Sequence, residues 1–581
     1  MLVYGDRART LDPSCHVAAL GARLAEVAAL PPGIGRHGAL VGAFITAGEL
    51  VQGLADAAFE RAGHDEAPPA AASALLTALA GAVRASWKNG FRSGALPDPA
   101  LLDRLRDEPM PAAITAKEPE GYAFYGLYPE AYLAAASALP RDRRWRVIGL
   151  RSIGTGLAAL VADALGAPPP VTVRPFGHPF SRRVALAPAL ERDLFADPEA
   201  AFAVVDEGPG LSGSSFGAVL DLLEGRGLGL ERVHALPGHG GDLGAQASDR
   251  HRRRWARVAR HAVGFDALVG EAAEPAHRLE TWLGDLVGPL QVPLEDVSGG
   301  AWRRHRTPDE AAWPPALAHQ ERRKVLARTR DGAWLARFAG LGAVGEAKLG
   351  LARRLAGAGF TPEPAGLRHG FLVERWVQAG PLDPDDDRDG LIAHLGRYLG
   401  FRARHLAADT PGASADALLA MARHNAAEAL GAEAAALDRF EGELPALSAA
   451  WRPVATDGRL HAHEWLRLGD GRLLKADALD HHAAHDLVGA QDIAWDVAGA
   501  GVEFGLSPAE LERLRRETEG RAGHAVDPGA VRFAVPCYLA FQLGVHTMGA
   551  AALAGWPEEA ARLRRAADAY AARLRALLER L

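Results

Sequence analysis

The segment at residues 201–224, AFAVVDEGPGLSGSSFGAVLDLLE, limits what this chain can fold into more than any other stretch. A short apolar run at 202–205 ends in two carboxylates, Asp206 and Glu207, and a loop of Gly, Pro and Ser then leads into an apolar-periodic helix. Free backbone N–H groups at 212–215, together with the positive end of that helix, can hold a phosphate. Such loops also occur where a chain merely turns. The acidic pair in front is therefore what favours a sugar-phosphate site.

This order of residues resembles the PRPP loop of type I phosphoribosyltransferases. The resemblance implies that Asp206 and Glu207 are catalytic residues that bind the ribose 2- and 3-hydroxyls. It also implies that the loop holds the 5-phosphate of PRPP, through Gly210, Ser212, Gly213, Ser214 and Ser215. The spacer GPGL departs from the family by one extra residue, which shifts the register of the phosphate contacts.

Strand and helix patterns alternate from residue 144 onward, with apolar strands at 145–150, 171–175 and 232–238, and this alternation predicts a parallel sheet. In the same resemblance, RSIGT after the first strand is the pyrophosphate loop, and a basic stretch after the second is the mobile loop that closes over the leaving group. The implied pyrophosphate-loop residues are Arg151, Ser152, Gly154 and Thr155. The implied mobile-loop residues are Arg174, His178, Arg182 and Arg183, with Arg174 counted as catalytic. An Arg at a strand end can instead be a solvated residue, and a single His can be structural.

The first 140 residues read as helical, with apolar spacing at 37–60 and 72–87. Four aromatic residues crowd a Gly/Pro-punctuated loop at 117–132: Tyr122, Phe124, Tyr125 and Tyr128. Aromatic rings in a loop can form the wall of a flat-ring pocket or plug the space between two domains. The pattern leaves both alternatives open.

The stretch at 298–315 has the Gly, Pro and charge content of a domain boundary, and a different succession of predicted elements follows it. A hairpin pattern at 325–340, a helix pattern at 345–360 and a strand pattern at 370–382 lead into a helical remainder, which contains a strand pair at 459–482. This succession resembles the aminoglycoside-phosphotransferase type of kinase fold. The resemblance implies ATP-binding roles for Arg337, Glu346 (or Lys348 beside it) and Glu374, and a metal-binding role for Asp477.

The kinase resemblance has a serious departure. The family's His-x-Asp followed four residues later by Asn is missing, so that Asp457 becomes a displaced catalytic base and Glu464 a metal ligand. A degenerate kinase fold that only binds its ligand fits the sequence equally well. A nearby cluster reads either as a transition-metal site or as hydrogen-bonded structure: Asp480, His481, His482, His485 and Asp486.

Composition sets the remaining bounds. A chain of 581 residues is too long for one core, and we expect a helical hood at 1–140, a phosphoribosyltransferase-like domain at 141–300 and a kinase-like domain at 318–581. The expected fold class is therefore multidomain α/β: a parallel sheet with a helical hood, plus an α+β kinase-like domain. A net charge of -7 argues against a nucleic-acid partner. Two distant cysteines and the lack of a leader or membrane-span pattern favour a cytoplasmic protein.

Two functions from different classes follow. The first is a bacterial enzyme that transfers phosphoribosyl from its substrate PRPP to a small acceptor, with Mg²⁺, while the kinase-like domain uses ATP on the product or precursor. The second is a sensor that binds PRPP or a nucleotide, with a pseudokinase scaffold. Small molecules are the expected partners, no membrane is expected, and a homodimer is left open.

Overall fold

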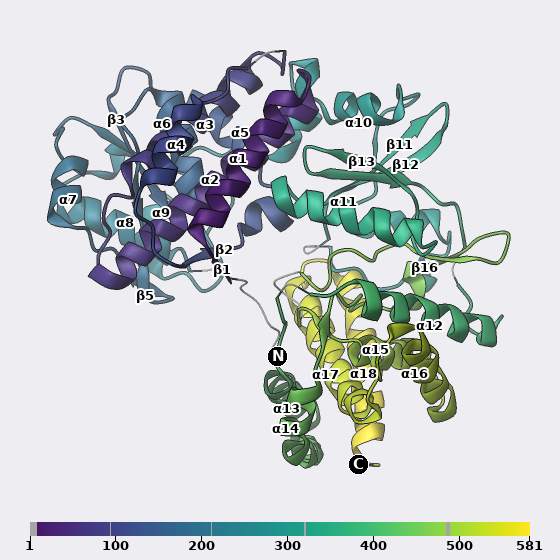
Figure 1. The fold of residues 1–581 in the computed structure, drawn as a ribbon. Helices are drawn as coiled ribbons and strands as arrows, with labels where there is room; N and C mark the ends of the chain where they lie inside the picture. Colours follow the sequence, from purple (N-terminus) through teal and green to yellow (C-terminus); the bar gives the residue numbers. More distant parts are fainter. Residues whose placement is uncertain are drawn as a thin grey trace.

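The computed structural model describes residues 8–92, 94–210, 212–318, 321–380, 382–408, 410–483 and 488–580. In Figure 1 the N-terminal helices and a parallel sheet form one body, a second sheet lies beside them, and a helical bundle carries the C-terminus. The protein is thus multidomain α/β.

The N-terminal region is helical, as its apolar spacing predicts. Its helices are α1 (Pro13–Ala29), α2 (Ile34–Ala62), α3 (Ala70–Lys88), α4 (Pro99–Asp107) and α5 (Pro129–Ser137). Strand β1 (Ala8–Leu11) pairs antiparallel with β2 (Ile114–Lys117) beside α2. Helix α2 packs against α1, α3 and the helix α6 of the sheet domain, so it lies in the middle of this body.

Helices α2 and α3 are long and apolar enough to cross a membrane by length and composition alone. In the structure, 83% of the most apolar window of α2 and 56% of that of α3 are buried inside the protein. Core helices that pack on all sides have this composition.

The parallel sheet has the strand order β4-β3-β7-β8-β9, and all its neighbours run parallel. Its strands are β3 (Trp145–Leu150), β4 (Val171–Val173), β7 (Ala201–Val205), β8 (Val233–Leu236) and β9 (Ala259–Arg260). The order reverses between β3 and β7. In open α/β sheets a crevice forms at this reversal, outside the carboxyl ends of the strands, and ligands bind there.

Alternate side chains of the central strands enter two different cores. Val147, Ala203 and Val205 join the core shared with the N-terminal helices and α6 (Gly154–Leu165). Ile148 and Val204 face the opposite core, which is covered by α7 (Pro188–Leu194), α8 (Ser214–Gly225) and α9 (Asp249–Trp255). Burial on both faces explains why these strands read as continuous apolar runs.

The second sheet is antiparallel, with the order β10-β11-β12-β14-β13. Its strands are β10 (Glu295–Asp296), β11 (Lys324–Thr329), β12 (Gly332–Phe338), β13 (Pro364–Arg368) and β14 (Phe371–Arg375). Strand β10 precedes residue 318, where we expected the kinase-like domain to begin. Ala336 and Val373 belong to the same continuous core as the N-terminal helices, and α11 (Gly342–Gly357) contacts α2.

The C-terminal bundle packs around its own core. Its main helices are α12 (Arg388–His405), α13 (Ala415–Leu430), α15 (Ala494–Glu503), α16 (Pro508–Ala522), α17 (Pro528–Ala552) and α18 (Pro557–Leu578). β16 (Trp465–Arg467) and β17 (Leu473–Lys475) form a short hairpin, and the segments just before and after it line a cleft. This hairpin confirms the strand pair expected at 459–482.

The basic, amphipathic pattern of residues 247–263 predicts one helix over this stretch, and the structure differs. Only α9 is helical there, and the chain then forms β9, the fifth strand of the parallel sheet. His261 N–H donates to the carbonyl oxygen of Ala235, so pairing with β8 overrides the helical pattern there.

The close approach of β3 to the start of α6 depends on Gly149. A Cβ atom at this position would lie 2.3 Å from the carbonyl oxygen of Gly154 and 2.7 Å from Ala158 Cβ. We expect Gly149→Ala to lower the free energy of unfolding by about 1–3 kcal/mol in urea titrations. Gly225→Ala, where a Cβ meets nothing within 4 Å, is the matched control and should change it by less than about 1 kcal/mol. Equal stability of the two variants would contradict this packing.

Candidate functional sites

The first candidate site lies at the reversal of the parallel sheet. The loop after β3 (residues 151–153) and the loop after β7 (residues 206–213) leave adjacent strands at their carboxyl ends. A Cβ atom at Gly154, the first residue of α6, would lie 2.8 Å from the carbonyl oxygen of Val205, the last residue of β7, so the ends of the two loop-bearing segments pack closely here. Two segments that the sequence assigned to one ligand are therefore neighbours.

The acidic pair closes the end of β7. Glu207 N–H donates to Asp206 Oδ1 (2.8 Å), and Gly121 N–H donates to Glu207 Oε2 (2.9 Å). Burial raises the pKa of Asp206 to about 7. Burial, and then the neighbouring Asp206, raise the pKa of Glu207 to about 8. Carboxyl groups kept partly protonated near neutral pH are typical of functional sites.

The Ser-rich loop lies under a basic hairpin. Strands β5 (Phe176–His178) and β6 (Ser181–Arg183) form this exposed hairpin, and Arg182 Nη1 donates to Ser215 Oγ (2.9 Å). The hydroxyls of Ser212 and Ser214 both donate to the carbonyl oxygen of Pro179 at the hairpin tip. Helix α8 starts at Ser214 after Gly213, whose φ of 63° favours glycine. The predicted mobile-loop and phosphate-loop residues are thus in contact.

Gly210 also has a left-handed φ, of 68°. Leu211, the last residue of the long spacer, lies outside the described residues.

In the loop after β3, Ser152 lines a small cavity of about 20 Å³ together with Tyr122 and Glu49. Thr155 is buried in the first turn of α6, and its hydroxyl has no hydrogen-bond partner among the described residues.

Two of the predicted cations are not presented to a ligand. Arg151 has a side chain that is 0% exposed and forms ion pairs with Asp56 (Nε to Oδ1, 2.9 Å) and with Asp65. Arg174 donates from Nε to Asp56 Oδ1 (2.8 Å) and from its backbone N–H to Asp65 Oδ2 (3.0 Å). Since buried cations need buried anions, these arginines anchor the N-terminal helices to the sheet. The expected pyrophosphate role of Arg151 and catalytic role of Arg174 are corrected on this ground.

The aromatic loop is mainly a plug. Tyr122, Phe124 and Tyr128 are buried, whereas Tyr125 is 61% exposed. Tyr128 packs near Phe338 of the second sheet. Most of the loop therefore fills the space between the domains, although Phe124 and Tyr125 also line a cavity of about 410 Å³.

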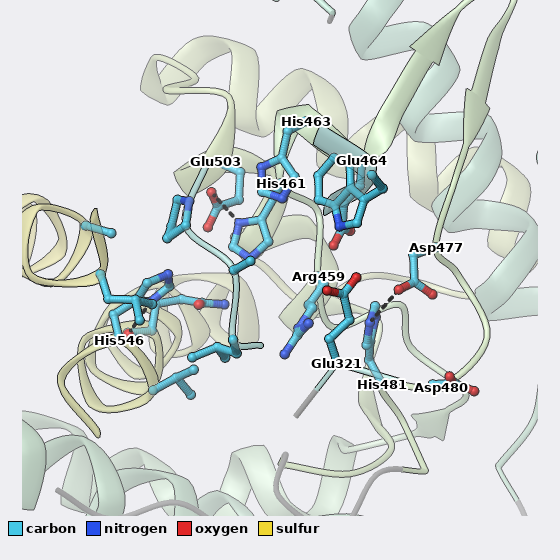
Figure 2. Close-up of a pocket in the computed structure, with 18 of the residues that line it drawn as sticks. Glu321, Arg459, His461, His463, Glu464, Asp477, Asp480, His481, Glu503 and His546 are labelled. Atoms are coloured by element: carbon cyan, nitrogen blue, oxygen red, sulfur yellow. Dashed lines mark hydrogen bonds and ion pairs between the residues drawn. The ribbon is translucent and has the colours of Figure 1, made fainter. Parts of the chain in front are cut away.

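The second candidate site is a cleft of about 380 Å³ between the second sheet and the helical bundle. Figure 2 shows His461, His463 and Glu503 on one side of it and Asp477, Asp480 and His481 on the other. The volume is in the usual range for small-molecule sites. Charged and imidazole groups dominate the labelled lining (Figure 2).

Arg337 and Asp477, to which the resemblance gave separate ligand-binding roles, meet in this cleft. Arg337 Nη1 donates to Asp477 Oδ1 (2.8 Å), and Nη2 lies 3.5 Å from Glu374 Oε2. Burial opposes the charge of Arg337, but Glu374 and Asp477 outweigh it and raise the pKa of the guanidinium. Burial also opposes the charge of Asp477, but Arg337 and His481 outweigh it and lower the pKa of that carboxyl. The three predicted residues form one charge network, in which Arg337 and Glu374 are buried and Asp477 is partly exposed.

Lys475, which sequence reasoning did not select, lies between the other predicted acids. Its Nζ is 2.5 Å from Glu464 Oε2 and 3.4 Å from Asp457 Oδ1, and its side chain is 0% exposed. Asp457 is equally enclosed and accepts a hydrogen bond from the Tyr398 hydroxyl. An enclosed carboxylate that already neutralises a lysine cannot reach a substrate hydroxyl, so the role of Asp457 as displaced base is corrected to a structural one.

Glu346 does not reach the cleft. It lies on α11 and accepts two hydrogen bonds from Arg23 of α1 (2.9 and 2.8 Å), with its side chain 46% exposed. Lys348, its neighbour on α11, points inward instead and lies 2.9 Å from Asp480. Burial lowers the pKa of Lys348 to about 8. Of the two residues that the resemblance left open on this helix, Lys348 points to the acidic cluster and Glu346 pairs with the N-terminal region.

The remaining polar groups of the cleft form internal pairs. His461 Nδ1 lies 3.0 Å from Glu503 Oε2, and the Tyr538 and Tyr570 hydroxyls donate to Glu503 Oε1. Of the acidic, His-rich cluster, Asp480 pairs with Arg322 and Lys348. His481 bonds to the Asp457 carbonyl oxygen (2.8 Å), which favours hydrogen-bonded structure. His485 and Asp486 lie outside the described residues.

No family model matches this chain, and no curated protein matches it. Solved structures similar to part of it include a choline/ethanolamine kinase family protein from Mesorhizobium loti, with 19% identity over 53% of this chain and 92% of that one and a TM-score of 0.34. A spectinomycin phosphotransferase solved with ADP and spectinomycin shares 12% identity over 52% of this chain and 98% of that one, with a TM-score of 0.33. An aminoglycoside phosphotransferase from Streptomyces rimosus, solved with ADP and streptomycin, shares 19% identity over 39% and 92%, with a TM-score of 0.25.

The raised pKa values of the acidic pair predict a pH-dependent stability. Between about pH 4 and pH 8 the unfolded chain has released these two protons while the folded chain still holds them, so folding stability falls as pH rises through this window. The double variant Asp206→Asn with Glu207→Gln has no titrating groups at these positions, so it should not show this fall in stability. Its Tm relative to wild type should therefore increase from pH 5 to pH 9 in thermal melts, whereas exposed Glu199→Gln should follow wild type. A constant Tm difference would contradict the raised pKa values of this half-buried pair.

Proposed function

We propose that the crevice of the parallel sheet binds PRPP and transfers its phosphoribosyl group to a small nucleophile. In this reaction the bond from ribose C1 to the pyrophosphate oxygen breaks, a bond from C1 to the acceptor forms, and pyrophosphate leaves with the bonding electrons. The acceptor gives up its proton to solvent or to a nearby base. An oxocarbenium-like transition state needs positioning, charge neutralisation and exclusion of water more than it needs a strong base.

The arrangement of three segments at the sheet reversal is the observation that carries this proposal. The start of α6 packs against the end of β7, the acidic pair follows β7 directly, and Arg182 of the basic hairpin donates to Ser215 at the start of α8. The first-turn N–H groups of α8 lack intrahelical acceptors and can bind the 5-phosphate. Arg182 and Arg183, unlike Arg151 and Arg174, lie on exposed strands and remain suitable partners for the pyrophosphate.

Asp206 and Glu207 suit the ribose hydroxyls once they are ionised, because a carboxylate accepts hydrogen bonds from a diol. Magnesium, if bound, would neutralise negative charge on the pyrophosphate. Hard carboxylate oxygens of the acidic pair match its preference for oxygen ligands. Since their pKa values are about 7 and 8, affinity for PRPP should increase with pH through this range.

Release of pyrophosphate from PRPP with Mg²⁺, across a panel of bases and amines, tests the proposal. We expect release with at least one acceptor. Asp206→Asn with Glu207→Gln should lower PRPP affinity in calorimetry at least about 100-fold, because each lost hydrogen bond to a charged group contributes roughly 1.5–3 kcal/mol. The exposed Glu199→Gln variant leaves the proposed PRPP site unchanged and is the control, so its PRPP affinity should equal that of wild type. Full affinity in the double variant would overturn the assignment, and tight binding without release would leave a PRPP sensor.

The cleft supports a second function, nucleotide binding, for which phosphotransfer and binding without reaction are the two alternatives. Arg337, Arg322 and Lys324 line it and could contact phosphates, and several of its solved neighbours bind AMP or ADP. Magnesium fits less well. Its expected ligands, Asp477 and Glu464, already neutralise Arg337 and Lys475, so an ion would have to displace a buried cation. This pairing favours a domain that binds a nucleotide without transferring its phosphate.

Thermal-shift measurements with ATP separate the two alternatives. If the cleft only binds, ATP should raise the Tm equally with Mg²⁺ and with a chelator, and ATP should not be consumed. Asp477→Ala should change this shift, since it frees Arg337, whereas Asp470→Ala on the exposed β16–β17 turn should not. An ATP shift that persists unchanged in Asp477→Ala would contradict the role of Asp477. A shift seen only with Mg²⁺, together with ADP formation, would favour the kinase.

A further inference from the structure

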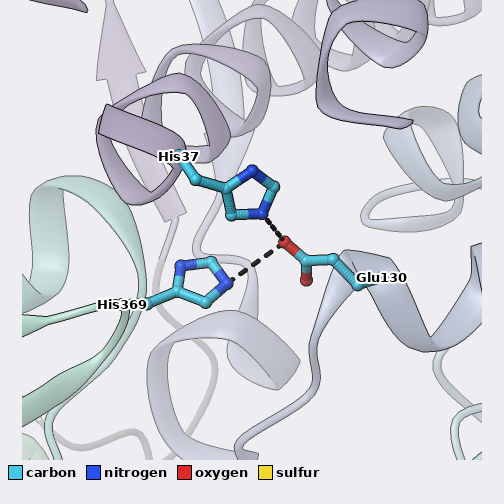
Figure 3. Close-up of side chains that lie close together, drawn as sticks. All are labelled: His37, Glu130 and His369. Carbon is cyan, nitrogen blue, oxygen red and sulfur yellow. Dashed lines mark hydrogen bonds and ion pairs between the residues drawn. The ribbon is translucent and has the colours of Figure 1, made fainter. Parts of the chain in front are cut away.

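Three chemically reactive side chains meet at a point outside both candidate sites. His37 lies on α2, Glu130 on α5 and His369 in the turn between β13 and β14, and Figure 3 shows all three pointing toward one another. Glu130 Oε1 lies 2.7 Å from His37 Nε2 and 3.1 Å from His369 Nε2. All three side chains are 0% exposed. Segments more than 200 residues apart thus deliver two imidazoles and a carboxylate to one enclosed point.

The hydrogen bonds of this cluster are incomplete. Glu130 Oε2 and His369 Nδ1 are buried without a hydrogen-bond partner among the described residues. A buried carboxylate oxygen without a donor or cation is costly, so native proteins rarely leave one. His37 differs, because its Nδ1 bonds to Ser86 Oγ (2.9 Å), which fixes the ring with Nε2 directed at Glu130. A cation at the centre would satisfy the free carboxylate oxygen.

The backbone holds His369 in an unusual conformation to place its ring there. Its φ is 40°, in the left-handed region that non-glycine residues rarely adopt. The Tyr128 hydroxyl donates to its carbonyl oxygen (2.8 Å), and the Tyr128 and Trp282 rings meet its imidazole edge-on. Such conformations persist where the surroundings enforce them, and they concentrate at functional positions.

The donor set and its spacing suit a transition metal. Two imidazole nitrogens and one carboxylate form a common zinc ligand set, with bonds of about 2.0–2.1 Å. Tetrahedral coordination at these bond lengths separates neighbouring ligand atoms by about 3.3 Å, close to the observed 2.7 and 3.1 Å. The three ligand atoms lie within 4.8 Å of one another. The His37–Ser86 hydrogen bond is the kind of outer contact that orients a metal-bound histidine.

We propose that His37, Glu130 and His369 bind a structural Zn²⁺ ion that ties the N-terminal helices to the second sheet. The second oxygen of Glu130, or a water molecule, completes the coordination. Two ligands come from α2 and α5 and the third from the β13–β14 turn, so the ion bridges the two halves of the chain. This site is independent of PRPP and of nucleotide.

Metal analysis of the untagged protein, purified from zinc-supplemented cultures, tests the proposal. Wild type should contain about one zinc ion per chain by mass spectrometry, and His369→Gln or Glu130→Gln should reduce this at least about tenfold. His234→Asn is the matched control, because His234 is also buried and lies 2.9 Å from a second imidazole, that of His261. Its zinc content should equal that of wild type.

Zinc retained in both cluster variants, or lost only in the His234 variant, would overturn the assignment. A second measurement does not depend on the folding of the cluster variants: it uses wild type alone, with the native metal exchanged for Co²⁺. Four-coordinate Co²⁺ absorbs strongly in the visible range, and we expect this band together with a higher Tm for the metal-loaded form. Absence of both the band and zinc from folded wild type would show that the cluster is only a hydrogen-bonded clasp.

Discussion

Burial of helix α2 is the constraint on which the rest of the structure depends. The helix contacts α1, α3, α6, β2 and α11, and so touches the N-terminal region, the parallel sheet domain and the second sheet domain. Such contacts require residues without a side chain at the points where neighbouring segments approach the helix most closely. A Cβ at Gly42 would lie 3.2 Å from the Cα of Gly342, and one at Gly53 would lie 2.7 Å from Ile114. Close packing at these small residues lets one apolar helix belong to a core that it shares with both sheets.

Charges on and just beyond this helix then set the sheet in place. Asp56 near its end and Asp65 just after it hold Arg151 and Arg174 at the carboxyl edge of the parallel sheet, while His37 near its start meets Glu130 and His369. Each contact is enclosed, where unpaired ionic groups would be expensive. The same principle governs the cleft, in which Lys475, Lys348 and Arg337 neutralise the surrounding carboxylates. Several charged residues that the sequence suggested as ligand contacts, such as Arg151, Arg174 and Asp457, instead form ion pairs within the protein.

Local patterns predicted the elements well where periodicity was strong. The strands at 145–150 and 201–205 and the long helices after residue 33 follow from continuous apolar runs and 3.6-residue spacing. Strand β9 was missed because a basic amphipathic pattern runs through it and only pairing with β8 decides its conformation. Within the sites, the Asp206, Ser215 and Arg182 neighbourhood was foreseen, since the ends of parallel strands meet at one edge. The direction of Glu346 and the enclosure of Asp457 were not, because a helix or loop pattern does not tell which partner lies opposite.

The sequence by itself determined that strand, acidic pair, Ser-rich loop and helix occur in that order, because β-strand and helix periodicities and turn chemistry are local properties. Only the tertiary structure decided which charges remain available. Asp56 and Asp65 precede Arg151 by more than 80 residues, and Glu130 precedes His369 by more than 200, yet each pair is enclosed in one core. Burial in a shared core fixes such partners through desolvation, which depends on the whole fold and leaves no short-range signal in the chain.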